Sequence, residues 1–358
     1  MESPVPTSSH PRPRTKKRAA TPRVGLTFNL RRVPAAGAAA SDEQAEFDSP
    51  ETVRHIHEAI AAHGHEVVDL EATRELPSRL AASPVDVVFN VAEGMAGRAR
   101  ESQVPALLEL LGIPYTGSDP TALAVTLDKA LAKRLVSQAG IHTPAFVLME
   151  TGRERLPPGF ELPAIVKPLA EGSSKGIAGS NVVETEAALR KLARQLAGRY
   201  RQPVLVERFL PGREFTVALL GERRPRVLPP LEVVFVDPTR KHPTYGFDNK
   251  FAGTSVRLDV PAKVGARLAR EIERVARAAF AVLGCRDFAR IDLRLDRGGA
   301  VHFIECNPLP GLTPGFSDFC LIAAAAGIDY RALIGEILAP ALRRWREQRN
   351  ERRRGMRK

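Results

Sequence analysis

The sequence predicts a multidomain α/β protein, and three observations support this fold class. The chain has 358 residues, which is enough for two or three domains. Apolar residues make up 44% of it, so most of the chain should fold. Its first third alternates strand-like and helix-like segments, which is typical of a doubly wound parallel sheet. We place this first domain at residues 23–120.

The first domain carries clear start and stop signals. The predicted strands are Val24–Phe28, 66–70 and 85–90, and the predicted helices are 49–63 and 102–111. Ser49 is a good N-cap and Pro50 suits the first helical position. Gly64 then favours the helix end. The long loop 29–47 beside the first strand is of the kind that often covers a substrate.

The rest of the chain predicts mixed α and β structure. Helices are expected at 120–140, 186–200, 264–283, 317–326 and 330–348, and strands at 164–167, 203–210 and 214–220. Polar loops are expected at 171–176 and 237–255. We place a central unit at 121–212 and a C-terminal unit at 213–342.

A hairpin near the C-terminus gathers three oxygen-bearing side chains. Alternating apolar residues predict two strands, and Arg297-Gly298-Gly299 is a turn signal between them. Glu305 and Asn307 are two residues apart on one strand and so share a face, with Asp292 opposite them on the partner strand. Such oxygens suit Mg²⁺ held jointly with substrate phosphates. A solvated hairpin with scattered acids is the alternative.

The loop 171–176 has the composition of a phosphate cover. Its glycines let the backbone approach an anion, and Ser173 and Ser174 add donors. Lys167 ends the strand before it, and Lys129 and Lys250 are further lysines in polar contexts. No Walker P-loop is present. Taken singly, each lysine is more often a solvated charge and such a loop is more often a surface turn.

Charge and cysteine content limit the class of protein. The basic ends 1–23 and 343–358 account for the net charge of +12, and the body between them is formally neutral. We predict that residues 1–22 are disordered and that both ends solubilise the protein rather than contact nucleic acid. Three cysteines without CxxC spacing argue for a reducing compartment, and no apolar run is long enough to span a membrane. We therefore expect a cytoplasmic protein.

The order of the motifs is more specific than any one of them. In sequence they are LLELLGIPYTGSDP (107–120), LDK (127–129), IVKP (165–168), EGSSKG (171–176), VLVERFLPGREFTVALLG (204–221), YGFDNKF (245–251), ARIDLRLD (289–296) and FIECNPLPGLTP (303–314). Over residues 85–340 the chain resembles the D-alanine–D-alanine ligases of the ATP-grasp superfamily. The resemblance implies a three-domain ATP-grasp fold with an N-terminal preATP-grasp domain.

The resemblance also implies an ATP-dependent ligase that forms a peptide bond, serves peptidoglycan and cell-wall synthesis, and is often a homodimer. ATP would lie between the central and C-terminal units. The residues that would bind it are Lys129, Lys167, Ser173, Ser174, Glu207, Phe209, Leu210, Glu214 and Lys250. The adenine pocket would include Glu207, and Glu214 would bind the ribose. The residues that would hold Mg²⁺ (or Mn²⁺) are Asp292, Glu305 and Asn307.

In the reaction that the resemblance implies, the carboxylate of a first amino acid attacks the γ-phosphate of ATP. The amine of a second amino acid then displaces phosphate from the acyl phosphate. Arg290 and the backbone at Gly311 would stabilise the intermediates, and Ser173 would take part in closing the site.

The departures from the family lie where substrates are chosen. The family's ammonium-binding glutamate has no clear counterpart, and Glu46 is its candidate replacement. Glu93 stands in place of a histidine, Phe251 in place of a tyrosine, and Phe316 in place of a serine. The chain could thus be a D-alanine–D-alanine ligase, a paralogue with other amino-acid or amine substrates, or a non-catalytic nucleotide-binding protein.

Overall fold

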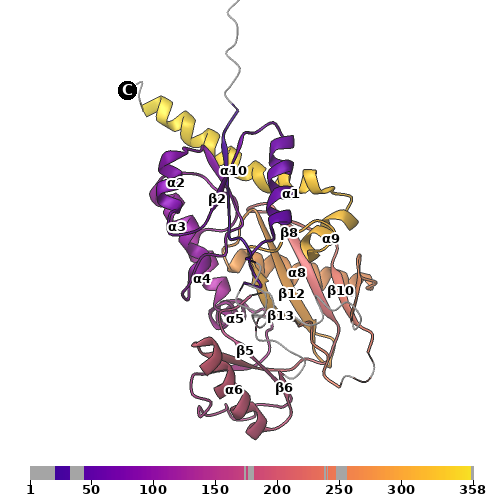
Figure 1. Ribbon diagram of the computed structural model, residues 1–358. Coiled ribbons are helices and arrows are strands. Elements are labelled where there is room, and N and C mark those ends of the chain that lie inside the picture. Colours follow the sequence, from indigo (N-terminus) through magenta and orange to yellow (C-terminus); the bar gives the residue numbers. More distant parts are fainter. Residues whose placement is uncertain are drawn as a thin grey trace, which may run out of the picture.

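The computed structural model contains three sheets, arranged as three lobes (Figure 1). It describes residues 21–32, 44–172, 175, 181–237, 239, 241–246 and 256–355. The N-terminal lobe holds a parallel sheet, and the other two lobes hold antiparallel sheets. The predicted α/β class is confirmed.

The N-terminal sheet is doubly wound, as predicted. Its strands are β1 (Val24–Phe28), β2 (Val67–Glu71) and β3 (Val87–Asn90), in the order β2-β1-β3. The helices are α1 (Pro50–Ala62), α2 (Leu76–Ala82), the 3₁₀ turn η1 (Arg100–Ser102) and α3 (Gln103–Leu110). Side chains of α1 pack on one face of the sheet, and side chains of α2 and α3 pack on the other. Helix α2 was not predicted.

The start and end of α1 follow the sequence signals. The Ser49 hydroxyl accepts a 3.1 Å hydrogen bond from the Thr52 N–H, and Pro50 is the first helical residue. Gly64 has φ +85°, a left-handed conformation in which glycine is favoured. These contacts confirm the predicted cap and stop.

The central sheet has the order β4-β7-β5-β6. Its strands are β4 (Phe146–Met149), β5 (Ala164–Pro168), β6 (Val182–Val183) and β7 (Val204–Arg208), and α6 (Glu186–Tyr200) packs against it. The sequence predicts β5, β7 and α6. Strands β4 and β6 are additional, and β6 is too short to leave a periodic pattern.

The predicted helical stretch 120–140 is two helices, α4 (Pro120–Leu127) and α5 (Lys129–Gln138). Asp128 separates them and caps α5, because its carboxylate accepts hydrogen bonds from two N–H groups of the first turn. Ala130 packs with the core of the central sheet, whereas Ala132 and Val136 pack with the core of the C-terminal sheet. Helix α5 therefore lies between the two sheets.

The C-terminal sheet has the order β11-β10-β8-β12-β13, with β9 paired to β8. Its strands are β8 (Glu214–Leu220), β9 (Arg226–Val227), β10 (Leu231–Phe235), β11 (Val256–Asp259), β12 (Phe288–Leu295) and β13 (Val301–Asn307). Helix α8 (Ala266–Val282) covers one face, and α9 (Asp318–Ala325) and α10 (Tyr330–Gly355) pack on the other.

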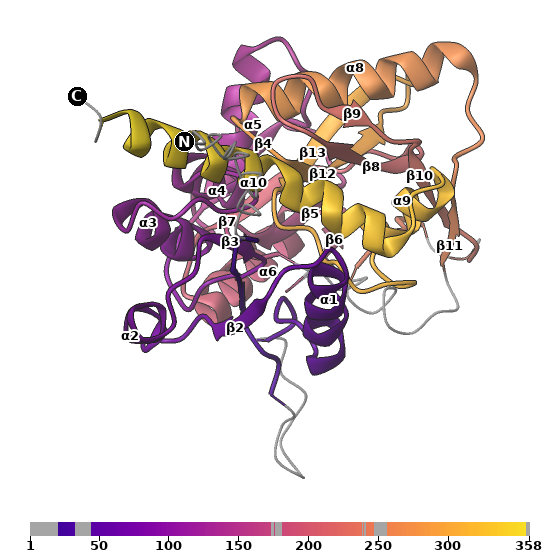
Figure 2. The ribbon, with the colours of Figure 1, turned by 90° about the horizontal axis from the view of Figure 1, so that it is seen from above.

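Helix α10 continues past Gln348, where the sequence analysis ended it, to Gly355. The basic residues 343–355 are therefore helical, which suits the helix propensity of arginine. Arg344 donates a 2.7 Å hydrogen bond to the Tyr115 carbonyl and a 3.0 Å one to Asp287. In both ribbon views α10 runs from the C-terminal sheet across the N-terminal lobe (Figures 1 and 2).

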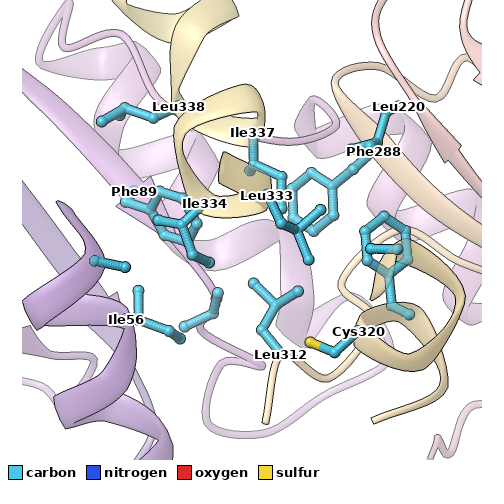
Figure 3. Close-up of a cluster of buried hydrophobic side chains, with 14 of the residues drawn as sticks. Ile56, Phe89, Leu220, Phe288, Leu312, Cys320, Leu333, Ile334, Ile337 and Leu338 are labelled. Carbon is cyan, nitrogen blue, oxygen red and sulfur yellow. The ribbon is translucent and has the colours of Figure 1, made fainter. Parts of the chain in front are cut away.

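One apolar core joins the N-terminal lobe to the C-terminal sheet (Figure 3). Ile56 of α1 and Phe89 of β3 meet Phe288 of β12 and Ile334 of α10 in this core. Leu312 also enters it and is almost fully buried. Because Leu312 follows Gly311 directly, its burial fixes the position of the Gly311 backbone.

Candidate active site

The predicted hairpin forms with the predicted pairing. In the register of β12 and β13, Asp292 lies opposite Glu305 and Arg290 lies opposite Asn307. At the turn, the Gly299 N–H donates a 3.1 Å hydrogen bond to the Asp296 carbonyl. The three oxygen-bearing side chains thus come from neighbouring positions of one hairpin.

Arg290 is held between two carboxylates. It donates hydrogen bonds of 3.0 and 2.9 Å to the two oxygens of Asp292, and its Nη1 lies 3.7 Å from Asp318. Burial lowers the pKa of Arg290, but Asp292 and Asp318 together raise the pKa by more than burial lowers it. The net shift is therefore upward. Asn307 also donates to Asp292, at 3.1 Å. The arginine is thus a fixed cation beside the predicted metal-binding hairpin.

Two carboxylates and an amide on adjacent strands suit a hard divalent cation. Across the part of the chain that the structure describes, no group of three or more His, Cys, Asp or Glu side chains could hold a metal by itself. A cation at the hairpin would therefore depend on the Asn307 amide oxygen and on substrate phosphate oxygens, as the sequence analysis expects.

One cavity, which we call the interdomain cavity, lies between the central and C-terminal sheets. Its lining includes Lys167, Glu207, Phe209, Leu210, Glu214, Thr216, Arg290, Asp292, Arg294 and Glu305. These residues come from β5, β7, β8, β12 and β13 and from the residues just after β7. Five of the nine predicted ATP-binding residues lie together here. Three others, Ser173, Ser174 and Lys250, lie outside the described residues, as does Phe251.

A buried lysine that the sequence analysis missed completes the charge balance of this cavity. The Nζ of Lys133 lies 2.6 Å from Glu207, and the Nζ of Lys167 lies 3.5 Å from the same carboxylate. Burial raises the pKa of Glu207, but the two lysines lower it more, so the carboxylate stays charged. At Lys133, burial lowers the pKa by more than the neighbouring Glu207 raises it, and the pKa of Lys133 falls to about 8. The signal was present, because Lys133 lies four residues after Lys129 on one helix face.

Arg294 is a second residue that the sequence analysis missed. Its Nη1 donates a 2.8 Å hydrogen bond to Glu214, the predicted ribose ligand. Its guanidinium lies 4.6 Å from the ring centre of Phe209, a predicted adenine contact. Arg294 is two residues after Asp292 on β12, so strand alternation could have placed it on the same face.

A second cavity, which we call the acidic cavity, is bounded by the hairpin, the residues that follow it and the N-terminal lobe. It is lined in part by Glu46, Asp48, Glu93, Glu101, Lys129, Glu171, Gly172, Glu305, Asn307, Arg290 and Gly311. Lys129, the remaining predicted ATP ligand, lies here, with its Nζ 3.6 Å from Glu305. Arg290 and Glu305 line both cavities. The two cavities therefore meet at these two side chains.

Glu46, the candidate ammonium ligand, is already ion-paired. Arg100 donates to both of its oxygens at 2.8 and 2.9 Å, and Lys175 lies 3.3 Å away. The Gly172 N–H also donates to it. Burial raises the pKa of Glu46, but Arg100 and Lys175 lower it more, and the net shift is downward. Glu46 thus joins the N-terminal lobe to Gly172 and Lys175 of the central unit.

The segment after Gly311 is ordered by Ser317 rather than by Phe316. The Ser317 hydroxyl accepts a 3.0 Å hydrogen bond from the Thr313 N–H. Phe316 is 51% exposed and lines a third cavity together with Ser317 and Tyr245. The serine next to Phe316 therefore has a structural partner already.

A central and a C-terminal antiparallel sheet that enclose a cavity, with lysines on one side and a carboxylate hairpin on the other, define an ATP-grasp enzyme. A family model described as D-ala D-ala ligase C-terminus matches residues 135–339. The chain belongs to the D-alanine–D-alanine ligase family, and it is an ATP-grasp ligase that forms a C–N bond.

Relatives cover most of the chain. An uncharacterised protein, y4sG of Sinorhizobium fredii, is 37% identical over 290 residues, which are 81% of this chain and 84% of the relative. The D-alanine–D-alanine ligase of Aquifex aeolicus is 34% identical over 292 residues, which are 81% of this chain and 94% of the relative.

Solved structures support the same fold. The D-alanine–D-alanine ligase of Bacillus anthracis complexed with ATP superposes with a TM-score of 0.70 at 23% identity, covering 92% of this chain and all of that chain. The VanG D-Ala:D-Ser ligase of Enterococcus faecalis superposes with a TM-score of 0.69 at 21% identity, covering 90% of this chain and 100% of that chain. Among the described residues, no helix is long and apolar enough to cross a membrane.

Proposed function

We propose that this ligase joins the carboxylate of one amino acid to the amine of another through an acyl phosphate, with release of ADP and phosphate. The observation that carries the proposal is the meeting of the two cavities at Arg290 and Glu305. ATP would occupy the interdomain cavity and the amino acids the acidic cavity. The γ-phosphate and the attacking carboxylate would then face each other at the shared wall.

In the first step, a carboxylate oxygen of the first amino acid attacks the γ-phosphorus of ATP. The bond from that phosphorus to the β,γ-bridging oxygen breaks, and its electron pair leaves with ADP. Arg290 is a cation at the shared wall, and Lys129 lies beside Glu305 in the acidic cavity; both would offset the charge on the transferring group. The fixed position of Arg290 means that little reorganisation is needed.

Asp292, Glu305 and Asn307 would hold Mg²⁺ (or Mn²⁺). When bound there, such an ion neutralises phosphate charge and orients the oxygens. Among this chain's own residues, Glu207 holds Lys167 in place and Arg294 holds Glu214. These pairs keep the nucleotide-facing side chains oriented, and the apolar residues Phe209 and Leu210 exclude water from the base.

In the second step, the neutral amine of the second amino acid attacks the acyl carbon. The bond between that carbon and the phosphate oxygen breaks, phosphate leaves, and the ammonium that forms loses a proton to solvent or to phosphate. The backbone at Gly311 lies on the cavity wall and is fixed by the buried Leu312. It would support the tetrahedral intermediate as Arg290 supports the acyl phosphate.

An assay of ADP release against D- and L-amino acids, singly and in pairs, tests the proposal. Hydroxylamine in the same assay would trap the acyl phosphate as a hydroxamate. We expect both signals with wild type and with Glu273→Gln, an exposed control on α8. We expect neither with Glu305→Gln. ATP binding without ADP release or hydroxamate for any amino acid would favour a non-catalytic nucleotide-binding protein instead.

A further inference from the structure

The wall of the acidic cavity that comes from the N-terminal lobe carries an excess of carboxyl groups. Asp48 precedes α1, Glu93 follows β3, and Glu101 lies in η1. Glu46 and Glu171 line the same cavity. Two connections of the N-terminal lobe, β1–α1 and β3–α3, thus deliver Asp48, Glu93 and Glu101 to one space beside Arg290 and Gly311, where the amino-acid substrates would react.

Some of these acids are neutralised within the protein. Glu46 is paired with Arg100 and Lys175, as described above. Glu171 lies 2.9 Å from the same lysine. Arg100 and Lys175 are thus both used by Glu46 and Glu171. They form a closed network at the edge of the cavity.

Asp48, Glu93 and Glu101 remain outside this network. The described residues supply no side-chain hydrogen bond and no ion pair to any of the three carboxyl groups. Glu101 is only 7% exposed, yet it lines the cavity. A buried carboxyl group without a partner is costly, and a cation supplied by a ligand would offset that cost.

Nearby cations do not remove the excess. Arg31 is the basic group that acts on Asp48, and Arg100 and Lys129 act on Glu101. Arg100 is already committed to Glu46, and Lys129 donates to the Glu171 carbonyl and faces Glu305. The acidic cavity therefore contains more carboxyl groups than the surrounding cations of the protein can pair with.

We propose that the amino-acid cavity selects a substrate with a second ammonium group on its side chain, a diamino acid, which Glu93, Glu101 and Asp48 bind. This inference rests on the proposed ligase function and names the substrate class of the same site. The α-carboxylate would still face Arg290, and the side-chain ammonium would point toward the N-terminal lobe. A site built for a buried cation discriminates strongly against a neutral isostere, because the acids are then left unpaired.

Isosteric pairs of amino acids test the proposal directly. The pairs are 2,3-diaminopropionate with 2-aminobutyrate, 2,4-diaminobutyrate with norvaline, and ornithine with norleucine, each as D and L forms. We expect kcat/KM for ADP release to be at least about tenfold higher for one diamino acid than for its neutral partner. Equal or faster turnover of every neutral partner would overturn the proposal and leave the ligase function standing.

Variants locate the preference. We expect Glu93→Gln and Glu101→Gln to remove most of the diamino preference, measured as the ratio of kcat/KM for the diamino acid to kcat/KM for its neutral partner. Glu66→Gln is the control, since it lies in the same lobe but is exposed and paired with Arg23. Thermal unfolding of each variant would show that it is folded. A preference that survives in both variants would contradict our assignment of these residues.

A binding measurement separates this inference from the ligase function. Calorimetry with Mg²⁺ and a non-hydrolysable ATP analogue reads the binding of each isosteric pair without turnover. Tighter binding of a diamino acid supports the proposal even if no amino acid releases ADP, in which case only the ligase function fails. Absence of such a difference overturns the proposal even if turnover of neutral amino acids is observed.

Discussion

The two cavities share Arg290 and Glu305 but differ in how their charges are balanced. In the interdomain cavity, Lys133 and Lys167 hold Glu207, and Arg294 holds Glu214. In the acidic cavity, Asp48, Glu93 and Glu101 lack ion partners among the described residues. A cavity whose charged side chains are paired with one another requires of its ligand mainly a matching shape and the charge of its phosphates. An unbalanced one needs a compensating charge, which makes it selective.

This difference also separates general chemistry from specificity. Lys133 comes from α5, and the other paired side chains come from strands of the central and C-terminal sheets, so their geometry is fixed by backbone pairing and core packing. The unpaired acids come from loops around the N-terminal sheet, where sequence can change without loss of the fold.

The largest effect is expected at the shared wall. Arg290→Lys keeps the charge but loses the planar fork that binds both oxygens of Asp292. We expect kcat for ADP release to fall by about 10²–10³-fold, as when a transition-state donor is removed. Arg257→Lys, in an exposed pair on β11, should be close to wild type. A loss of less than tenfold would mean that Arg290 is structural rather than catalytic.

The next effect concerns stability in the paired cavity. Lys133→Met removes the closer of two cations from the buried Glu207, which should cost about 3 kcal/mol in the free energy of unfolding. Urea denaturation measures it, with the exposed Lys191→Met as control. Adding Glu207→Gln to Lys133→Met should recover part of the lost free energy of unfolding, because the double variant no longer buries the Glu207 carboxylate. If the single variant loses under about 1 kcal/mol, the pairing contributes little.

Sequence reasoning reached much of the fold and of the paired cavity for identifiable reasons. The hairpin was predictable because apolar alternation and Arg297-Gly298-Gly299 define its strands and turn. The position of Lys167 followed from its place at a strand end. Lys133 and Arg294 carried only a periodicity signal, one helical turn after Lys129 and two strand positions after Asp292. Such a signal is too common to single out a residue.

The acidic cavity was less predictable, because its contacts are long-range. Glu46 was a candidate ammonium ligand, but it pairs with Arg100, which is 54 positions away in the chain. Nothing local to either residue encodes that contact. Glu93 was marked as a departure from the family, yet its neighbours Asp48 and Glu101 were not. Strand β10 and helix α2 were also missed, since short elements carry weak patterns.

The unbalanced cavity should make stability depend on pH. Burial raises the pKa of Glu101 from 4.5 to about 7. Arg100 opposes this shift by lowering the pKa, whereas Glu46 also raises it. Between these two values the folded protein binds more protons than the unfolded chain, so the free energy of unfolding falls as pH rises. Asp48, whose pKa burial also raises to about 7, should add to this trend.

Glu101→Gln removes one titrating group and should therefore stabilise the protein above pH 7. We expect the variant to gain about 2 kcal/mol relative to wild type between pH 4.5 and pH 8. Thermal unfolding across that range measures the gain, and Glu66→Gln should show no comparable trend. A difference between Glu101→Gln and wild type that is the same at all pH values would show that Glu101 does not titrate in this window.

The smallest effect is expected at the nucleotide base. Arg294→Met removes the partner of Glu214 and the cation that stacks on Phe209. We expect the KM for ATP to rise about tenfold with kcat little changed, because the contact helps ground state and transition state alike. Arg294→Lys keeps a cation without the planar fork and should give an intermediate KM. If KM is unchanged while kcat falls, Arg294 acts on the reacting phosphate. The charges of the interdomain cavity would then do more than orient the nucleotide.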